Sequence, residues 1–192
     1  MTYLATLLLA VPTFLAAADV QEIKPISLAG VWQCTRTVPI VRLPGDSGMR
    51  ADPGPSPRAL AIANGEVAGI TWETQQVPKP WDRCGDAWKD YDGEAVFTRQ
   101  VEIADPGAGT WDLALGSIDD FDVTWVNGVQ VGSTDKSKPG AWAFSRHYLI
   151  PPGVLKSGSN RVVVRVFDQF GEGGFTGNTK DLVLRPMVTP AK

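Results

Sequence analysis

Three acidic residues, Asp119, Asp120 and Asp122, lie close together at one point of the chain. Paired carboxyl groups hydrolyse glycosidic bonds when they flank the bond. Such pairs usually come from separate strands, whereas these three residues are almost adjacent. Two other uses suit them: side-chain hydrogen bonds that cap a loop, and ligation of Ca²⁺ through oxygen. We expect loop capping, with cation or ligand binding as the alternative, and no catalytic residue here.

Serine chemistry is the other hydrolytic route. Ser47 lies in the run Pro44-Gly-Asp-Ser-Gly, and a serine nucleophile needs a base that a third group orients. The only histidine, His147, lies in a predicted strand, and the loop around Ser47 is proline-rich and forms no strand-to-helix turn. We therefore expect neither residue to be catalytic and the protein not to be an enzyme. A hydrolase acting on glycosidic bonds or O-acetyl esters is the alternative.

Sugar binding suits other residues of the chain. Sugars present apolar faces and hydroxyl edges, which proteins meet with aromatic rings beside Asp, Asn or Arg. The candidate ligand-binding residues, in or beside predicted loops, are Trp81, Asp82, Arg83, Trp88, Asp119, Asp120, Trp142, Arg146, Asp168 and Phe170. For the loop aromatics, filling the end of the domain is the alternative. Four other tryptophans lie in predicted strands and are expected in the core: Trp32, Trp72, Trp111 and Trp125.

The two cysteines, Cys34 and Cys84, form one disulfide if the protein is exported to an oxidising compartment. Two unpaired thiols are the alternative. Two distant cysteines and one histidine give no ligand spacing for zinc. We therefore expect no metal site at these residues and no cofactor, with Ca²⁺ at the acidic residues left open.

The elements that would position these side chains are strands. Within Leu115–Gly132, Asn127-Gly128 favours a two-residue type I′ turn, which predicts that Val126 faces Val129 and that Thr124 faces Val131. Nine strands are expected: Leu28–Arg36, Val67–Val77, Glu94–Ile103, Thr110–Leu115, Val123–Val126, Val129–Val131, Trp142–Ile150, Arg161–Asp168 and Leu182–Val188.

The remaining segments are mostly loops. The loop at about 37–57 is rich in proline and glycine, Lys79–Gly93 is a second long loop, and Ala59–Asn64 reads as either a strand or one helical turn. Without a convincing helix, this spacing predicts an all-β fold, an antiparallel β-sandwich or jelly roll. We expect one domain over residues 19–192.

The N-terminal residues indicate export. Residues 1–18 are uncharged and apolar and end in three alanines before Asp19, which predicts a signal peptide cleaved after Ala18. The protein is therefore expected to be secreted or periplasmic, without membrane attachment after cleavage, and an uncleaved anchor is the alternative. The formal net charge of −3, with no cluster of Lys or Arg, argues against nucleic acid as a partner.

Several motifs recur in the order of a known domain. They are Val77-Pro-Lys-Pro-Trp, Tyr91-Asp-Gly-Glu-Ala-Val-Phe-Thr-Arg, Leu115-Gly-Ser-Ile-Asp-Asp, Val123-Thr-Trp-Val-Asn-Gly and Tyr148-Leu-Ile-Pro-Pro-Gly, followed by the loop from Gly171. Together they resemble the galactose-binding-like jelly roll of family 2 glycoside hydrolases, most closely the version in sialate O-acetylesterase-like proteins. The resemblance covers Leu28–Val188 and is strongest from Trp72 to Gly174.

The resemblance implies a sugar-binding domain, while the catalytic domain of that family has no counterpart in the sequence. The expected function is therefore a secreted, non-catalytic carbohydrate-binding module with carbohydrate as its partner. Two alternatives stay open. One is a part of a glycoside hydrolase or sialate O-acetylesterase-type system, and the other is an interaction module that docks a separately encoded glycan-degrading enzyme.

Overall fold

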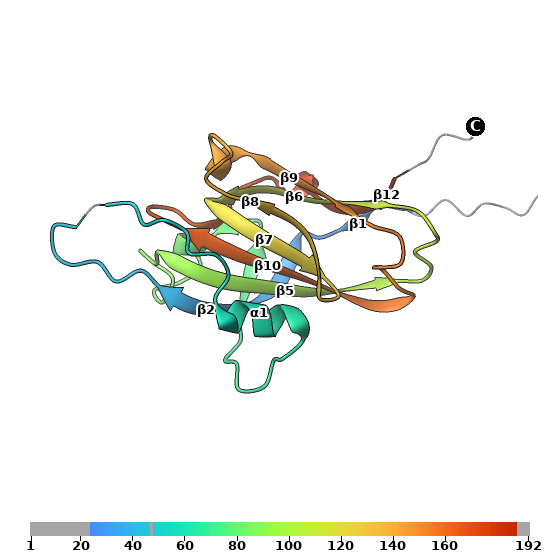
Figure 1. Ribbon diagram of the computed structural model, residues 1–192, viewed down its shortest axis with the longest axis horizontal. Coiled ribbons are helices and arrows are strands. Elements are labelled where there is room, and N and C mark those ends of the chain that lie inside the picture. The colour runs from blue at the N-terminus through green and yellow to red at the C-terminus, as the bar shows by residue number, and fades with distance from the viewer. Residues whose placement is uncertain (1–23, 47, 188–192) are drawn as a thin grey trace, which may run out of the picture.

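Two six-stranded antiparallel sheets face each other in a β-sandwich (Figure 1). The computed structural model describes residues 24–46 and 48–187, so the predicted signal peptide and Ser47 lie outside the described residues. The sandwich confirms the fold class expected from the sequence. Among the described residues, no helix is long and apolar enough to cross a membrane.

The first sheet, here the β6 sheet, has the order β1-β12-β6-β11-β4, with β9 also paired to β6. Its strands are β1 (Ile26–Ser27), β4 (Lys79–Pro80), β6 (Trp111–Asp119), β9 (Ser145–Ile150), β11 (Gly174–Phe175) and β12 (Leu182–Pro186). Three of these strands have only two residues each, and they account for the difference between the nine expected strands and those found. No periodic pattern can develop over two residues.

The second sheet, here the β10 sheet, has the order β3-β2-β5-β10-β7-β8. Its strands are β2 (Gly30–Pro39), β3 (Glu73–Val77), β5 (Gly93–Ile103), β7 (Phe121–Val126), β8 (Val129–Thr134) and β10 (Gly158–Asp168). The alternation of apolar residues in β10 predicts two faces, and Val162, Val164 and Val166 indeed face the core between the sheets, while Val163 and Phe167 face the other way. This alternation places β10 at the centre of the domain.

The hairpin of β7 and β8 confirms the predicted turn but not the whole predicted register. Asn127 and Gly128 have φ of 50° and 84°, as a type I′ turn requires, and Val126 pairs with Val129. Thr124, however, pairs with Gly132 and not with Val131, because a bulge shifts the register. A Cβ at Gly132 would lie 2.0 Å from Cδ1 of Tyr148, so the shifted register brings a glycine beneath this ring.

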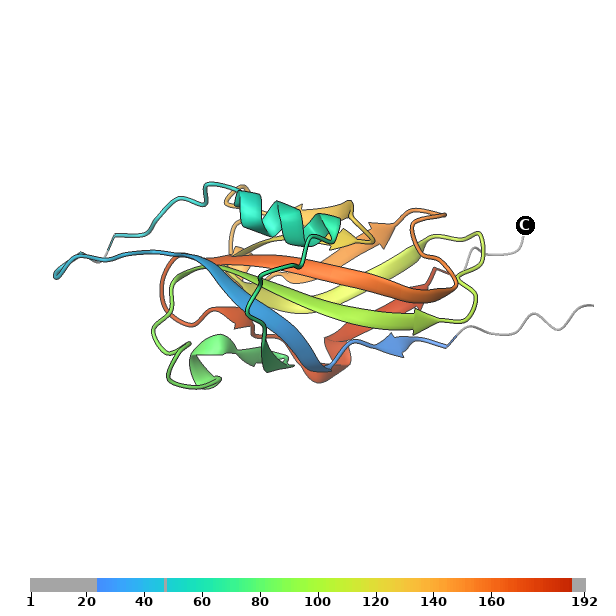
Figure 2. The same ribbon diagram turned by 90° about the horizontal axis from the view of Figure 1, so that it is seen from below.

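A helix covers part of the outer face of the β10 sheet (Figure 2), at the segment that the sequence left open between a strand and one helical turn. The helix α1 (Pro57–Asn64) begins after Ser56, whose side chain accepts from the Ala59 N–H, and ends at Gly65 in the left-handed conformation. Its inner residues Ala59, Ile62 and Ala63 pack on side chains of β5, β7 and β10. Ser-Pro at the start and Gly at the end are helix signals that were present in the sequence.

Two predicted strands are shorter than expected. The strand expected from Val67 begins only at Glu73, and the strand expected from Trp142 begins at Ser145. Before the latter, the chain forms a 3₁₀ helix, η2 (Ala141–Ala143), and two others are η1 (Trp81–Arg83) and η3 (Thr179–Asp181). The predicted loop over 79–93 therefore contains both β4 and η1.

Candidate functional site

Three aspartates meet where strands of both sheets end. Asp119 ends β6, Asp120 joins β6 to β7, and Asp168 ends β10. The backbone N–H of Asp120 donates to the carbonyl of Phe167 at 3.3 Å, which holds the turn beside the end of β10. One carboxylate oxygen from each of the three residues lies within 4.8 Å of the others. We call these residues the acidic cluster; the sequence offered Asp168 as a candidate but gave no sign that it joins the pair.

The carboxyl groups of the acidic cluster differ in exposure and in bonding. Asp119 and Asp120 are half-buried, whereas Asp168 is fully buried. Asp120 accepts from the backbone N–H of Gln169 at 3.0 Å, and Asp168 Oδ1 accepts from that of Phe170 at 3.1 Å. Asp168 Oδ2 is buried and has no hydrogen-bond partner in the described part of the chain. Asp120 therefore does brace a loop, but these contacts leave one carboxylate oxygen unsatisfied.

Burial and mutual repulsion raise two pKa values in the acidic cluster. Burial first, and then the charges of Asp92, Asp120 and Asp119, raise the pKa of Asp168 to about 8. Burial and the neighbouring carboxyl group of Asp120 raise the pKa of Asp119 to about 7. Near neutral pH, three full negative charges are therefore unfavourable here, which favours a protonated carboxyl group in the cluster.

The cationic side chains around the acidic cluster already pair with other acids. Arg146 lies 2.9 Å from Asp122, and Arg42 lies 2.6 Å from Asp92. Arg83 pairs with Glu172 at 2.5 Å. Within residues 24–46 and 48–187, no salt bridge reaches Asp119, Asp120 or Asp168.

Arg146 organises this end of the sandwich from within and is not a surface ligand contact. Its side chain is fully buried, and Nη2 donates to the carbonyl of Asp120 at 2.8 Å, while Nη1 donates to the carbonyls of Ala141 and Phe144. The expectation that Arg146 contacts a ligand is wrong, because its donors are used inside the protein. Asp122, expected to cap a loop together with Asp119 and Asp120, is buried against this guanidinium.

Trp81 and Trp88 are core residues, which corrects their assignment as ligand contacts. Both rings are almost fully buried, and their indole N–H groups donate to the Tyr91 carbonyl and to Glu73 Oε2. A Cβ at Gly173 would lie 2.3 Å from Cε2 of Trp81, so the chain passes directly over this ring. Neither indole presents a face on which a sugar could stack. For Trp81 and Trp88 the structure therefore supports the alternative prediction, that loop aromatics fill the end of the domain.

Asp82 and Arg83 brace loops at the same end. Asp82 is half-buried, and its two carboxylate oxygens accept from the backbone N–H groups of Gly173 at 3.0 Å and Asp90 at 3.2 Å. Arg83 is exposed in its pair with Glu172. Arg83 remains accessible to a ligand, whereas the carboxylate of Asp82 is used by the loops.

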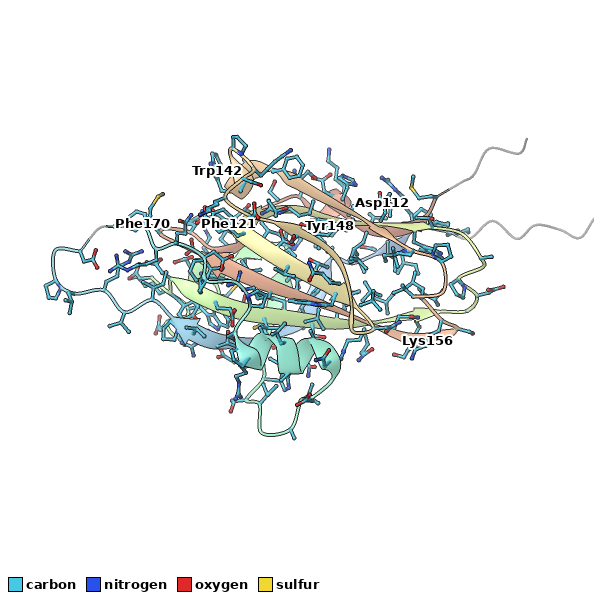
Figure 3. The ribbon with its side chains drawn as sticks, in the orientation of Figure 1. Asp112, Phe121, Trp142, Tyr148, Lys156 and Phe170 are labelled. Atoms are coloured by element: carbon cyan, nitrogen blue, oxygen red, sulfur yellow. The ribbon has the colours of Figure 1, made fainter. Side chains whose placement is uncertain are left out.

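Trp142 and Phe170 are exposed aromatic residues near the acidic cluster. Their side chains are 59% and 57% exposed, and Figure 3 shows both toward the end of the sandwich where β10 terminates. Phe170 follows Asp168 by two residues and stacks under the guanidinium of Arg42 at 5.4 Å. Trp142 lies in η2. Arg146 donates to the carbonyls of Ala141 and Phe144 at the two ends of η2 and also to the carbonyl of Asp120, which holds η2 close to the acidic cluster. Phe144, at the end of η2, is also exposed.

The remaining candidate residues lie outside the acidic cluster, and one of them, Ser47, is not among the described residues. His147, the histidine weighed with Ser47, is exposed on β9, in agreement with its predicted strand, and its Nδ1 lies 3.2 Å from Asp112 Oδ1. Cys34 and Cys84 are free thiols, so the expected disulfide is not formed in this structure. Burial raises the pKa of Cys34 to about 12, which makes it an unreactive thiol.

No protein-family model and no curated protein matches the sequence. Among solved structures, the fold resembles part of the β-glucuronidase from Ruminococcus gnavus. Its complex with D-glucuronic acid aligns with a TM-score of 0.56 and 20% identity over 80% of this chain and 23% of that chain. The complex with uronic deoxynojirimycin gives 0.57 and 19% over 77% and 22%.

These neighbours show the fold. They are β-glucuronidases, which supports the family 2 resemblance named from the sequence motifs, while the link to sialate O-acetylesterase-like proteins stays a prediction. This chain spans less than a quarter of the length of the enzymes it matches.

Proposed function

We propose that this protein is a non-catalytic carbohydrate-binding domain that contacts a glycan with the end of the sandwich around the acidic cluster. The observation that carries the proposal is the exposure of Trp142 and Phe170 on loops beside polar groups that still face solvent. Exposed rings cover the apolar faces of sugars, and adjacent carboxylates and guanidinium groups accept from or donate to their hydroxyls. Export through residues 1–18 belongs to the same proposal.

The fold supports a role in carbohydrate binding but does not determine which sugar is bound. The β-glucuronidase that shares this fold was captured with D-glucuronic acid, a ligand that carries a carboxylate. The end of the sandwich described here is itself rich in carboxyl groups, and like charges repel. We therefore expect the metal-free protein to prefer neutral oligosaccharides to uronic acids.

A second role is docking onto a glycan-degrading enzyme, either of the glycosidase or of the sialate O-acetylesterase type. The observation that favours it is that the matched segment is one part of a longer enzyme in each structural neighbour. In that role Trp142 and Phe170 would pack against the enzyme and not against a sugar.

Titration of a glycan panel against the mature protein tests the first role. The panel holds neutral and uronate-containing oligosaccharides, each measured by calorimetry with Ca²⁺ and with EDTA. We expect weak saturable binding that Trp142→Ala reduces about tenfold, as loss of about 1.4 kcal/mol of ring contact predicts. Leu149→Ala is the matched control, because Leu149 is equally exposed on β9. Absence of saturable binding in both conditions contradicts the proposal, and co-purification with an enzyme would then favour docking.

A further inference from the structure

We propose that the acidic cluster is a calcium site in which Asp119, Asp120 and Asp168 each supply a carboxylate oxygen to one ion. The proposal concerns Ca²⁺ binding alone and does not require the glycan binding proposed above. It follows from the spacing of the oxygens, from an unpartnered buried oxygen, and from the charge balance around the three residues.

The spacing of the carboxylate oxygens suits one shared ion. Calcium binds oxygen at about 2.4 Å, so two oxygens on opposite sides of the same ion lie at most about 4.8 Å apart. The three aspartates offer oxygens that all fall within 4.8 Å of one another. Since two of them are half-buried and one is fully buried, an ion here would have protein on one side and water on the other.

The buried oxygen of Asp168 independently indicates a ligand. Oδ1 accepts from the Phe170 N–H, whereas Oδ2 is buried with no hydrogen-bond partner among the described residues. A buried carboxylate oxygen without a partner is costly, and such groups are normally hydrogen-bonded, ion-paired or bound to metal. A cation shared with Asp119 and Asp120 would give this oxygen a partner.

Within residues 24–46 and 48–187, no salt bridge brings a cationic side chain to the acidic cluster. Arg146, Arg42 and Arg83 each pair with an acid outside the cluster. Elsewhere in the described structure, the charge of the fully buried Asp122 is neutralised by Arg146. The protein therefore pairs a buried aspartate with an arginine where the site is purely structural. At the acidic cluster, where no arginine forms such a pair among the described residues, the proposed ion would supply the compensating charge.

The chemistry of the donors selects calcium among common metal ions. All three donors are carboxylates, which suit hard cations, whereas zinc favours His and Cys. The single histidine lies against Asp112 in another part of the fold. Calcium takes six to eight oxygens in flexible geometry, whereas Mg²⁺ demands a near-ideal octahedron, and the half-exposed Asp119 and Asp120 leave room for waters to complete the larger shell.

The ion would tie together segments that are distant in the sequence. Asp119 and Asp120 lie at the turn from β6 to β7, and Asp168 begins the loop that carries Phe170. Calcium would therefore fix the loops around the exposed aromatic rings in addition to neutralising the cluster.

Calorimetric titration of the full chain with CaCl₂ alone tests this proposal, after treatment with EDTA and dialysis at neutral pH. We expect one ion per chain and a rise in melting temperature on saturation. Asp168→Asn should weaken the affinity at least tenfold while leaving a cooperative melt. If that variant does not fold, Asp120→Asn is measured in its place, because its carboxyl group is half-exposed. Asp135→Asn is the matched control, since Asp135 is an exposed loop aspartate that accepts from a backbone N–H two residues on.

Three results would overturn the proposal. The first is a folded wild-type protein that takes up no Ca²⁺ at concentrations up to about 10 mM, above the range of weak extracellular sites. The second is equal loss of affinity in Asp168→Asn and Asp135→Asn, which would place the ion elsewhere. The third is Mg²⁺ binding as tightly as Ca²⁺, which would remove calcium as the assigned ion. None of these measurements contains a glycan, so failure here is separable from failure of carbohydrate binding.

Discussion

Asp122 and Asp168 are both fully buried, yet the protein treats their charges differently. Asp122 lies 2.9 Å from Arg146 Nε and also accepts from the hydroxyls of Tyr148 and Thr124. Asp168 has two further carboxyl groups as neighbours and an oxygen without a partner. One region is a closed network of satisfied groups, and the other is a concentration of like charges.

A second network shows that pairing is the general solution in this fold. Glu94 of β5 is buried against Arg165 of β10 at 2.8 Å, and the same guanidinium binds Asp52 through both terminal nitrogens. Against this background, the acidic cluster differs, because no arginine forms a salt bridge with its carboxylates in the described part of the chain. The spacing of its oxygens and the unpartnered oxygen of Asp168 are the reasons why we place the proposed ion there.

The largest expected effect comes from breaking the paired region. Arg146→Met leaves Asp122 buried without its cation and frees the carbonyls of Asp120, Ala141 and Phe144. We expect the free energy of unfolding to fall by about 3–5 kcal/mol, measured by urea denaturation. In the double variant with Asp122→Asn, the uncompensated charge is removed and part of the loss should return. A loss below about 1 kcal/mol in the single variant would show that the pair does not support this end.

In EDTA, changes to Asp168 of the acidic cluster should have an intermediate, pH-dependent effect on the free energy of unfolding. The folded pKa of Asp168, raised by burial and by Asp92, Asp120 and Asp119, is about 8 against an ordinary 3.8. Between these values the folded state holds a proton that the unfolded chain has lost. Its contribution to stability is therefore present at low pH and declines as the pH rises toward 8, by up to about 1.4 kcal/mol per pH unit.

Asp168→Asn removes this titration and is the direct measurement. The variant should show a flatter dependence of unfolding free energy on pH and should exceed the metal-free wild type in stability near pH 8. If the free energy of unfolding depends on pH in the same way in both proteins, Asp168 is not an uncompensated buried acid, and the proposed difference from Asp122 is wrong.

The smallest effect is expected where acid and base are paired but exposed. Arg83 and Glu172 lie 2.5 Å apart with side chains 63% and 48% exposed, and water and salt weaken such pairs. Arg83→Ala should change the free energy of unfolding by less than about 1 kcal/mol, measured by thermal denaturation at low and high salt. A loss as large as that of Arg146→Met would show that pairing matters here regardless of burial.

The sequence predicted those parts of the fold that depend on local signals. Alternation in β10 and the Asn127-Gly128 turn are read over a few residues, and the structure confirms both. The shifted pairing of Thr124 could not be read in this way, because it places Gly132 beneath a ring that comes from β9. Bulges depend on such contacts between distant elements.

The candidate site was predictable only in its residue types. Asp119, Asp120 and Asp168 were candidates, but their meeting depends on β6, β7 and β10 ending together. Arg146 lies 24 residues beyond Asp122, so its pairing has no local signal either. Trp81 is buried because the glycines at 173 and 174 let the chain pass directly over its ring. The sequence around Trp81 shows only a tryptophan in a predicted loop and does not indicate this distant contact.

The tether of Arg165 to Asp52 has a consequence for how the chain tolerates change. The segment from β2 to α1 extends from the sandwich in Figures 1 and 2, and the protein holds it at both ends. The N–H of Ile40 donates to the carbonyl of Asp92, and Arg165 binds Asp52 and the Gly54 carbonyl. Between these points Val41 and Leu43 are exposed. Since each doubling of a loop costs only about 0.6 kcal/mol, a second folded domain inserted beside Leu43 would leave the sandwich intact.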